Sequence, residues 1–278
     1  MNATQATSDW FPWLSRFIHN HAGIVVPASR GYLAETRLTR LLAHTDDGSI
    51  SALVRRLQRG DSPELITAVV NAFTTNETSF LRDPHVYDLF LTDMLPKIVE
   101  QQAAVKRIRI WSAACSTGQE PYSLAMSLMH GRRDLSDWAI EIVASDLSTD
   151  ALRTAEAGAY RAHEIKRGLP AEWQKSFFTQ EGRLWVVKDK VREHVKFVPA
   201  NLVTGALPAG PFDVVFMRNV LIYFDEPTRH SVFRRIHKQM APSAPLLLGG
   251  AEGATSTPLG TFERHVSKGV HWLRRSQA

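Results

Sequence analysis

The sequence predicts an α/β protein: a doubly wound parallel sheet with a small inserted antiparallel β-subdomain, preceded by an all-α N-terminal domain. Three observations predict this fold. The first 74 residues hold only helical apolar patterns, short β-rich runs alternate with helical stretches after Asp83-Pro84, and one stretch from about 161 to 193 breaks that alternation. We therefore expect domains over 1–74 and 75–278, with a linker over 75–90.

The N-terminal domain is expected to be a helical bundle. Apolar residues at helical spacing predict one helix from about Phe11 and a second over Tyr32–Ala43. A third helix is predicted between Ser49, a good N-cap, and Gly60, a residue typical of helix C-termini. A fourth begins at Ser62-Pro63, where Ser62 is the expected N-cap and proline is favoured at the first helical position.

Alternating strands and helices predict the parallel sheet of the second domain. The expected strands are Ile108–Trp111, Ile140–Ala144, Val195–Val198, Val214–Met217 and Leu246–Leu248. The expected crossover helices are Pro121–Met129, Thr149–Ala157 and Pro227–Met240. The tail Val266–Leu273 is expected to add an antiparallel edge strand or hairpin.

The inserted stretch is predicted to form a small β element. A short helix over Pro170–Phe178 is followed by alternating Leu184, Val186 and Val191 near Gly182. This pattern does not fit a crossover helix, so we expect a separate small sheet.

Composition excludes several classes of protein. The 278 residues are 44% apolar and 22% charged, which argues against a disordered chain. No run approaches the ~18 apolar residues of a membrane span, and no secretory signal is visible. The single Cys gives neither a disulfide nor a structural zinc site. Without a block of five like charges, the net charge of +5 does not indicate nucleic-acid binding. We expect a cytoplasmic protein without a metal.

Polar residues follow the predicted strands where ligands bind in open α/β sheets. After the first strand, small residues lead to Glu120, where a helix N-terminus begins. This turn lacks the glycine patterns of dinucleotide and triphosphate sites, and an ordinary turn is an equal alternative. Asp146 follows the second strand and can accept ribose hydroxyls, or else cap the next helix. Asn201 can read an adenine edge or shape a turn, and Arg218-Asn219 ends the fourth strand.

Four segments resemble the CheR-type chemotaxis receptor methyltransferases. They are Thr75–Arg82 (TNETSFLR), Trp111–Ser123 (WSAACSTGQEPYS), Ala144–Leu147 (ASDL) and Phe212–Asp225 (FDVVFMRNVLIYFD). The resemblance covers nearly the whole chain. It implies a Rossmann-like class I methyltransferase fold, S-adenosyl-L-methionine as cofactor with S-adenosyl-L-homocysteine as product, and glutamate side chains of chemoreceptors as methyl acceptors.

The family pattern also implies the roles of individual residues. Cofactor contacts are implied for Asn76, Thr78, Arg82, Glu120, Asp146, Asn201, Leu202, Arg218 and Asn219. We expect Arg82 and Tyr223 to orient the acceptor carboxylate; the alternative for Tyr223 is a packed aromatic residue with its hydroxyl at the surface.

Partner recognition is expected to involve the N-terminal domain. The family is thought to bind acidic receptor helices through a basic helical face, here Arg37, Arg40, Arg55, Arg56 and Arg59. An ordinary solvated face is the alternative, because residues 1–85 hold eight basic and eight acidic residues. The segment Phe178–Leu184 looks shorter than the loop with which some members grip a receptor's C-terminal pentapeptide. We expect no such tether, and a monomer.

Two other functions compete with this interpretation. A nucleic-acid methyltransferase acting on adenine usually carries Asp/Asn-Pro-Pro-aromatic after the fourth strand, where this chain has Arg218–Leu221. A signalling adaptor that retains only the cofactor pocket is the other. The presence of Arg82, Glu120, Asp146 and Tyr223 argues against lost catalysis.

Overall fold

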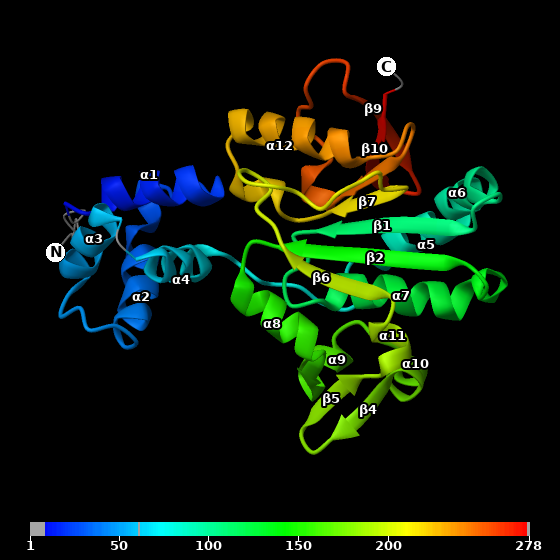
Figure 1. Ribbon diagram of the computed structural model, residues 1–278, viewed down its shortest axis with the longest axis horizontal. Coiled ribbons are helices and arrows are strands. Elements are labelled where there is room, and N and C mark those ends of the chain that lie inside the picture. The colour runs from blue at the N-terminus through cyan, green and yellow to red at the C-terminus, as the bar shows by residue number, and fades with distance from the viewer. Residues whose placement is uncertain (1–8, 61, 277–278) are drawn as a thin grey trace. The chain divides into compact units, whose positions relative to one another are not determined.

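The computed structural model describes residues 9–60 and 62–276. The chain divides into two compact units. We call the chain up to Thr75 together with Tyr223–Thr228 the helical unit, and Asn76–Ile222 together with the chain from Arg229 onward the sheet unit (Figure 1). Residues 1–8, which the sequence analysis assigned to the helical domain, lie outside the described residues.

The helical unit contains the four predicted helices. They are α1 (Phe11–Ala22), α2 (Gly31–Leu42), α3 (Ile50–Arg59) and α4 (Pro63–Phe73), with a short 3-10 turn η1 (Ala28–Arg30) before α2. The Ser49 hydroxyl accepts the Ala52 N–H and the Ser62 hydroxyl accepts the Leu65 N–H, so both predicted N-caps are confirmed. Gly60 ends α3 in the left-handed conformation that glycine adopts without strain.

The sheet unit is built on seven strands in the order β6-β2-β1-β7-β8-β10-β9. Their bounds are β1 Arg107–Ala113, β2 Ala139–Asp146, β6 Val195–Pro199, β7 Val214–Met217, β8 Pro245–Leu248, β9 Phe262–Ser267 and β10 Val270–Arg275. The first five are parallel, and the β9–β10 hairpin adds to β8 antiparallel, so the doubly wound sheet and its antiparallel edge are confirmed. The strand order reverses between β1 and β7, which places the switch point at these two strands.

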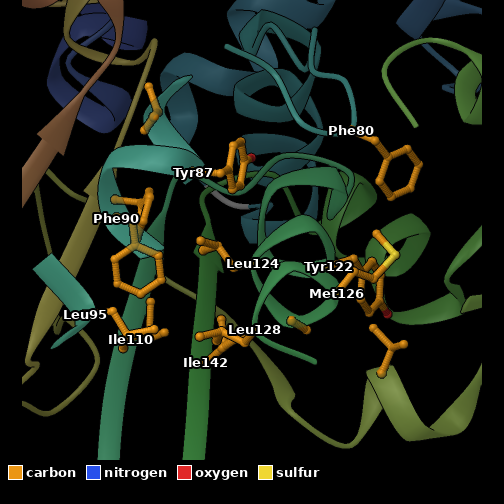
Figure 2. Packing of buried hydrophobic residues seen from close by; sticks show 14 of the residues in the cluster. Phe80, Tyr87, Phe90, Leu95, Ile110, Tyr122, Leu124, Met126, Leu128 and Ile142 are labelled. Atoms are coloured by element: carbon orange, nitrogen blue, oxygen red, sulfur yellow. The ribbon is translucent and has the colours of Figure 1, made fainter. Parts of the chain in front are cut away.

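Helices connect and cover the strands. They are α5 (Pro84–Leu89), the π-helical turn η2 (Phe90–Met94), α6 (Leu95–Gln102), α7 (Gln119–Gly131), the turn η3 (Arg133–Leu135), α8 (Thr149–Ala157), η4 (Leu221–Tyr223), α12 (Glu226–Gln239) and η5 (Gly250–Glu252). Apolar residues of α5, η2, α6 and α7 meet those of the strands in one core, where Phe90 and Leu124 lie near Ile110 and Ile142 (Figure 2). Leu152 of α8 belongs to a second cluster with Cys115 and Ala144. Burial of this kind contributes roughly 1.5–3 kcal/mol for each large side chain.

The predicted linker 75–90 is irregular only in part. No helix or strand is present from residue 74 to 83, but α5 begins at Pro84, whose fixed φ suits the first helical position. The buried Phe80 ring packs edge-on against Tyr160 and Phe178, which anchors the linker in the sheet unit.

The inserted β-subdomain forms a three-stranded antiparallel sheet in the order β3-β5-β4. Its elements are β3 (Ala159–Arg161), α9 (Ala162–Lys166), α10 (Ala171–Phe177), β4 (Phe178–Glu181), β5 (Leu184–Val187) and α11 (Asp189–Arg192). The β4–β5 hairpin projects away from the seven-stranded sheet (Figure 1). The expectation that Val191 continues the strand pattern is wrong: it lies buried in α11, because a one-turn helix after β5 points it inward.

Candidate active site

The loop after β1 is shaped by a run of unusual backbone conformations. Ala114 and Ser116 have φ of 60° and 54°, and Gly118 has φ of 94° just before α7. A side chain at Gly118 would come within 2.8 Å of the Ala155 Cβ and 2.9 Å of the Tyr160 hydroxyl. Glycine is therefore required here by packing against α8 and β3, and the loop reaches the end of β2 in a tight turn.

Asp146 ends β2 and is buried beside this loop. Its carboxylate accepts the backbone N–H of Ser116 at 2.7 Å and of Ser148 at 2.8 Å. The Ser148 hydroxyl in turn accepts the Ala151 N–H, so Ser148 caps α8 and Asp146 does not. Burial raises the pKa of Asp146 above its ordinary value, although the backbone N–H bonds oppose the shift.

The linker is joined to the loop after β1. The Ser116 hydroxyl donates to the Asn76 carbonyl at 2.9 Å, and the Leu81 N–H donates to the Ser123 hydroxyl on α7 at 2.9 Å. Leu81 and Asp83 have positive φ values of 48° and 55°, which make a sharp turn on either side of Arg82. The turn is thus held in place in the sheet unit even though its backbone is unfavourable.

Arg218 is the centre of this arrangement. Its side chain is 2% exposed; Nη1 donates to Glu120 at 3.0 Å, and Nη2 donates to the Arg82 carbonyl at 2.8 Å and to Asp83 at 2.6 Å. Glu120 also accepts the Ser112 hydroxyl at 2.8 Å. Burial works to lower the pKa of Arg218, but the charges around it, Glu120 foremost, raise it overall, so the guanidinium is charged.

The side chains of Arg82 and Thr78 are less constrained. Arg82 is half-buried, and its guanidinium donates to the Glu77 carbonyl at 3.3 Å. Thr78 is also half-buried in the irregular part of the linker. The network of Arg218 therefore fixes the backbone of Arg82 and leaves the side chain's end at the surface of the sheet unit.

Asn201 shapes a turn after β6. Its Oδ1 accepts the N–H groups of Val203 and Thr204 at 2.9 and 3.3 Å, which is the turn role considered from the sequence. Leu202 is buried directly after it. An adenine contact by the Asn201 side chain stays a prediction.

The comparisons with known proteins follow the same division. Residues 9–74 match the model described as CheR methyltransferase, all-alpha domain, and residues 76–264 match CheR methyltransferase, SAM binding domain. The chain belongs to the CheR methyltransferase family. It is 38% identical over 248 residues to "Chemotaxis protein methyltransferase 1" of Pseudomonas aeruginosa, covering 87% of this chain and 89% of the relative. It is 37% identical over 260 residues to "Chemotaxis protein methyltransferase" of Vibrio parahaemolyticus, covering 92% and 93%.

Membership in the CheR methyltransferase family makes this chain an S-adenosylmethionine-dependent methyltransferase. The chemistry of the strand-end residues suits that cofactor. Asp146 ends β2, and Glu120, at the start of α7, is hydrogen-bonded to Ser112 of the neighbouring strand β1. The cofactor carries ribose hydroxyls and an ammonium group, which can donate hydrogen bonds to these two carboxylates.

Tyr223 does not belong to the sheet unit. It is the last residue of η4, but it groups with the helical unit, where its carbonyl accepts the Val25 N–H at 2.9 Å. Phe224 forms an antiparallel bridge with Ile24, and Asp225 pairs with His19 at 2.9 Å. The backbone next to Tyr223 is therefore set by contacts with the loop after α1 and with α1 itself.

The five predicted recognition arginines fall into two groups. Arg37 donates to the carbonyls of Ala72 and Thr74 at 3.1 and 3.4 Å and so closes the C-terminus of α4. Arg56 pairs with Asp47 at 3.2 Å. The remaining three, Arg40, Arg55 and Arg59, are exposed.

Several residues of this site were not predicted from the sequence. They are Ser112, Ser116, Asp83, Tyr87 and Glu252. Glu252 follows β8, so applying the strand-end rule to the fifth strand as well would have found it. The buried Tyr87 ring lies 5.9 Å from the Arg218 guanidinium, and burial raises the pKa of Tyr87 far above its ordinary value.

Two absences hold for the described part of the chain. Over residues 9–60 and 62–276, no cluster of three or more His, Cys, Asp or Glu side chains could hold a metal ion. Within the same ranges, no helix is both long and apolar enough to cross a membrane.

Proposed function

We propose that this chain transfers the methyl group of S-adenosylmethionine to glutamate side-chain carboxylates of chemoreceptors, forming glutamate methyl esters. The observation that carries the proposal is the buried Arg218, which ties Glu120 to the Arg82 turn within the segments that resemble the family. The names of the Pseudomonas and Vibrio relatives, both chemotaxis protein methyltransferases, support a methyl-transfer role in chemotaxis.

Methyl transfer to a carboxylate requires little of the protein beyond positioning the two reactants. S-Adenosylmethionine supplies, when bound, a methyl group that its sulfonium already activates. A glutamate carboxylate is ionised at pH 7, so no general base has to remove a proton from it. The chain's residues must hold the carboxylate in line for attack and limit its solvation without binding it too tightly.

We assign each strand-end residue a role in this task. Asp146 accepts ribose hydroxyls, and Glu120 accepts the ammonium group. Asn76, Thr78, Asn201, Leu202 and Asn219 complete the cofactor site, and Arg218 holds its parts together. Arg82 and Tyr223 are each assigned a role in orienting the acceptor: the Arg82 guanidinium can pair with a carboxylate, and the Tyr223 hydroxyl can donate to one.

The exposed arginines of the helical unit support an acidic partner. Arg40, Arg55 and Arg59 are exposed, whereas Arg37 and Arg56 are half-buried and bind other residues of the helical unit. The β4–β5 turn holds only the two residues Gly182 and Arg183, which supports the expected lack of a pentapeptide tether. Calorimetric binding of such a peptide would contradict that expectation.

The test uses cofactor labelled on its methyl group, a chemoreceptor signalling fragment and the purified protein. After gel separation, the receptor band is treated with alkali, and we expect the label to leave as methanol, as a carboxyl methyl ester requires. The Arg82→Ala variant should lose this activity, and Arg107→Ala, a matched change at an exposed arginine, should retain it. Label that resists alkali would contradict carboxyl methylation, and a wild-type protein that binds S-adenosylhomocysteine but labels no receptor would favour the adaptor.

A further inference from the structure

A buried carboxylate lies behind the loop that carries Asn219. Glu252 ends the 3-10 turn η5, directly after β8, and is fully buried. Its Oε2 accepts the N–H groups of Asn219 and Gly249, both at 2.8 Å, and its Oε1 accepts the Leu221 N–H at 2.7 Å. One side chain therefore joins the loops that follow two neighbouring strands, β7 and β8.

The loop after β7 depends on these bonds. Asn219 has a φ of 60°, a left-handed conformation that residues other than glycine adopt at a cost in energy. Asn219 and Leu221 lie beyond the end of β7, so their N–H groups have no strand partner. Without an acceptor, buried N–H groups are strongly unfavourable, and the Glu252 carboxylate is the acceptor that the fold provides.

Gly249 leaves the space that the side chain of Asn219 occupies beside Glu252. A Cβ at position 249 would lie 2.7 Å from the Asn219 Nδ2 and 2.9 Å from its backbone nitrogen. The amide of Asn219 thus occupies the space that the missing side chain leaves. Glu252 fixes the backbone of Asn219, and Gly249 makes room for its side chain.

We propose that Glu252 is a positioning residue for cofactor binding: it holds Asn219 in the conformation that contacts S-adenosylmethionine. The inference rests on the proposed function, which places Asn219 in the cofactor site. Burial raises the pKa of Glu252, while the backbone N–H groups around it, that of Asn219 foremost, oppose the shift and favour the charged form.

The test replaces the carboxylate by an amide of the same shape. In Glu252→Gln, one oxygen becomes an NH2 group, which then faces a backbone N–H in place of an acceptor. We measure binding of S-adenosylhomocysteine by calorimetry at a temperature where circular dichroism shows each variant to be folded. We expect Glu252→Gln to bind about tenfold to a hundredfold more weakly than the wild type. The matched change at an exposed glutamate, Glu263→Gln, should bind within about twofold of the wild type.

A direct change at Asn219 separates this inference from the site assignment. If Asn219→Ala binds weakly and folded Glu252→Gln binds normally, the positioning role is wrong and the cofactor site stands. If Asn219→Ala binds normally, the assignment of Asn219 fails and takes the inference with it. In steady state, Glu252→Gln should raise the KM for S-adenosylmethionine and leave the KM for the receptor unchanged, which a general loss of stability would not do.

A second variant keeps the inference testable if Glu252→Gln does not fold. Gly249→Ala retains the carboxylate but adds a methyl group 2.7 Å from the Asn219 Nδ2 and 2.8 Å from the Glu252 Oε2, so it disturbs the contact between the two residues directly. We expect it to weaken S-adenosylhomocysteine binding by a similar factor while its circular dichroism matches the wild type. Wild-type affinity in a folded Gly249→Ala protein would overturn the proposal that this loop's conformation controls binding.

Discussion

Both terminal nitrogens of the Arg218 guanidinium donate hydrogen bonds: Nη1 donates to Glu120, and Nη2 donates to Asp83 and to the Arg82 carbonyl. A lysine presents one compact charge and cannot reach Glu120, Asp83 and the Arg82 carbonyl together. We expect Arg218→Lys to lower kcat/KM about a hundredfold, because at least one of the bonds that tie Glu120 to the Arg82 turn is lost. The matched change Arg234→Lys, at an exposed position of α12, is the control in the labelled-methyl assay. A loss of less than threefold would contradict the central role of Arg218.

From the raised pKa of Asp146 we expect cofactor binding to depend on pH. Its pKa is raised by burial, and only the ionised carboxylate accepts hydrogen bonds with both oxygens. As pH falls through this raised pKa, we expect the affinity for S-adenosylhomocysteine to fall. The Asp146→Asn variant should bind weakly with a flatter pH profile, as calorimetry between pH 7 and the acid range will measure.

The raised pKa of Asp146 also affects the stability of the fold, with the opposite dependence on pH. Because the pKa of Asp146 is higher in the folded than in the unfolded state, the folded state binds the proton more tightly. The group's contribution to stability is therefore greatest at low pH and is reduced as pH rises through the folded pKa. We therefore expect the affinity for S-adenosylhomocysteine to fall in acid without a parallel drop in melting temperature. A fall in affinity that coincides with a fall in melting temperature would contradict this expectation.

The site residues that were predicted from the sequence share one property: each lies at the end of a strand or follows it within a few residues. Glu120, Asp146 and Arg218 were found that way. Asp83 and Tyr87 were not, because their importance comes from contacts with Arg218, 135 residues or so away in the chain. Such long-range pairings leave no local pattern, so sequence reasoning can recover the strand-end residues but not the partners that hold them.

At the scale of elements, the buried apolar runs predicted the strands well. All five predicted parallel strands are present: β1, β2, β7 and β8 contain short apolar runs that are buried in the sheet, whereas β6 lies at its edge and has no fully buried residue. The hairpin of the tail was also expected. The misassigned Val191 shows a limit of predicting strands from alternation. Leu184 and Val186 have strand spacing, but they do not determine whether the next apolar residue lies in a strand or in a one-turn helix.

The segment Tyr223–Thr228 carries a prediction of its own. Phe224 is buried and bridges to Ile24, so Phe224→Ala removes packing that holds the backbone of Tyr223. We expect it to lower kcat and the melting temperature, with a cost of about 3–5 kcal/mol in stability. Binding of S-adenosylhomocysteine by calorimetry should stay close to wild type, because the proposed cofactor residues belong to the sheet unit. The milder Phe224→Leu serves as control; weakened cofactor binding in both variants would contradict this separation.

At the scale of the whole molecule, charge on the helical unit should govern the receptor and not the cofactor. The double change Arg55→Ala, Arg59→Ala removes two exposed charges, and we expect the KM for the receptor to rise severalfold with kcat nearly constant. Added salt should narrow the difference from wild type, since screening weakens exposed charges. Arg107→Ala is the matched control, and an unchanged receptor KM in the double variant would contradict the recognition face.

Arg37 should behave differently from these two. It closes the last turn of α4 through the carbonyls of Ala72 and Thr74. We expect Arg37→Ala to lower the free energy of unfolding by about 1–2 kcal/mol, as denaturant titration will measure. An unchanged stability together with a raised receptor KM would return Arg37 to the recognition face.

The grouping of Tyr223–Thr228 with the helical unit has a consequence for how such proteins can be recombined. The chain passes between its two units three times: after Thr75, after Ile222 and after Thr228. A chimera that takes only the first 75 residues from a relative would leave this six-residue segment facing a foreign surface. Grafting both pieces together would preserve the native match, so the boundary for exchanging specificity between family members is discontinuous in sequence.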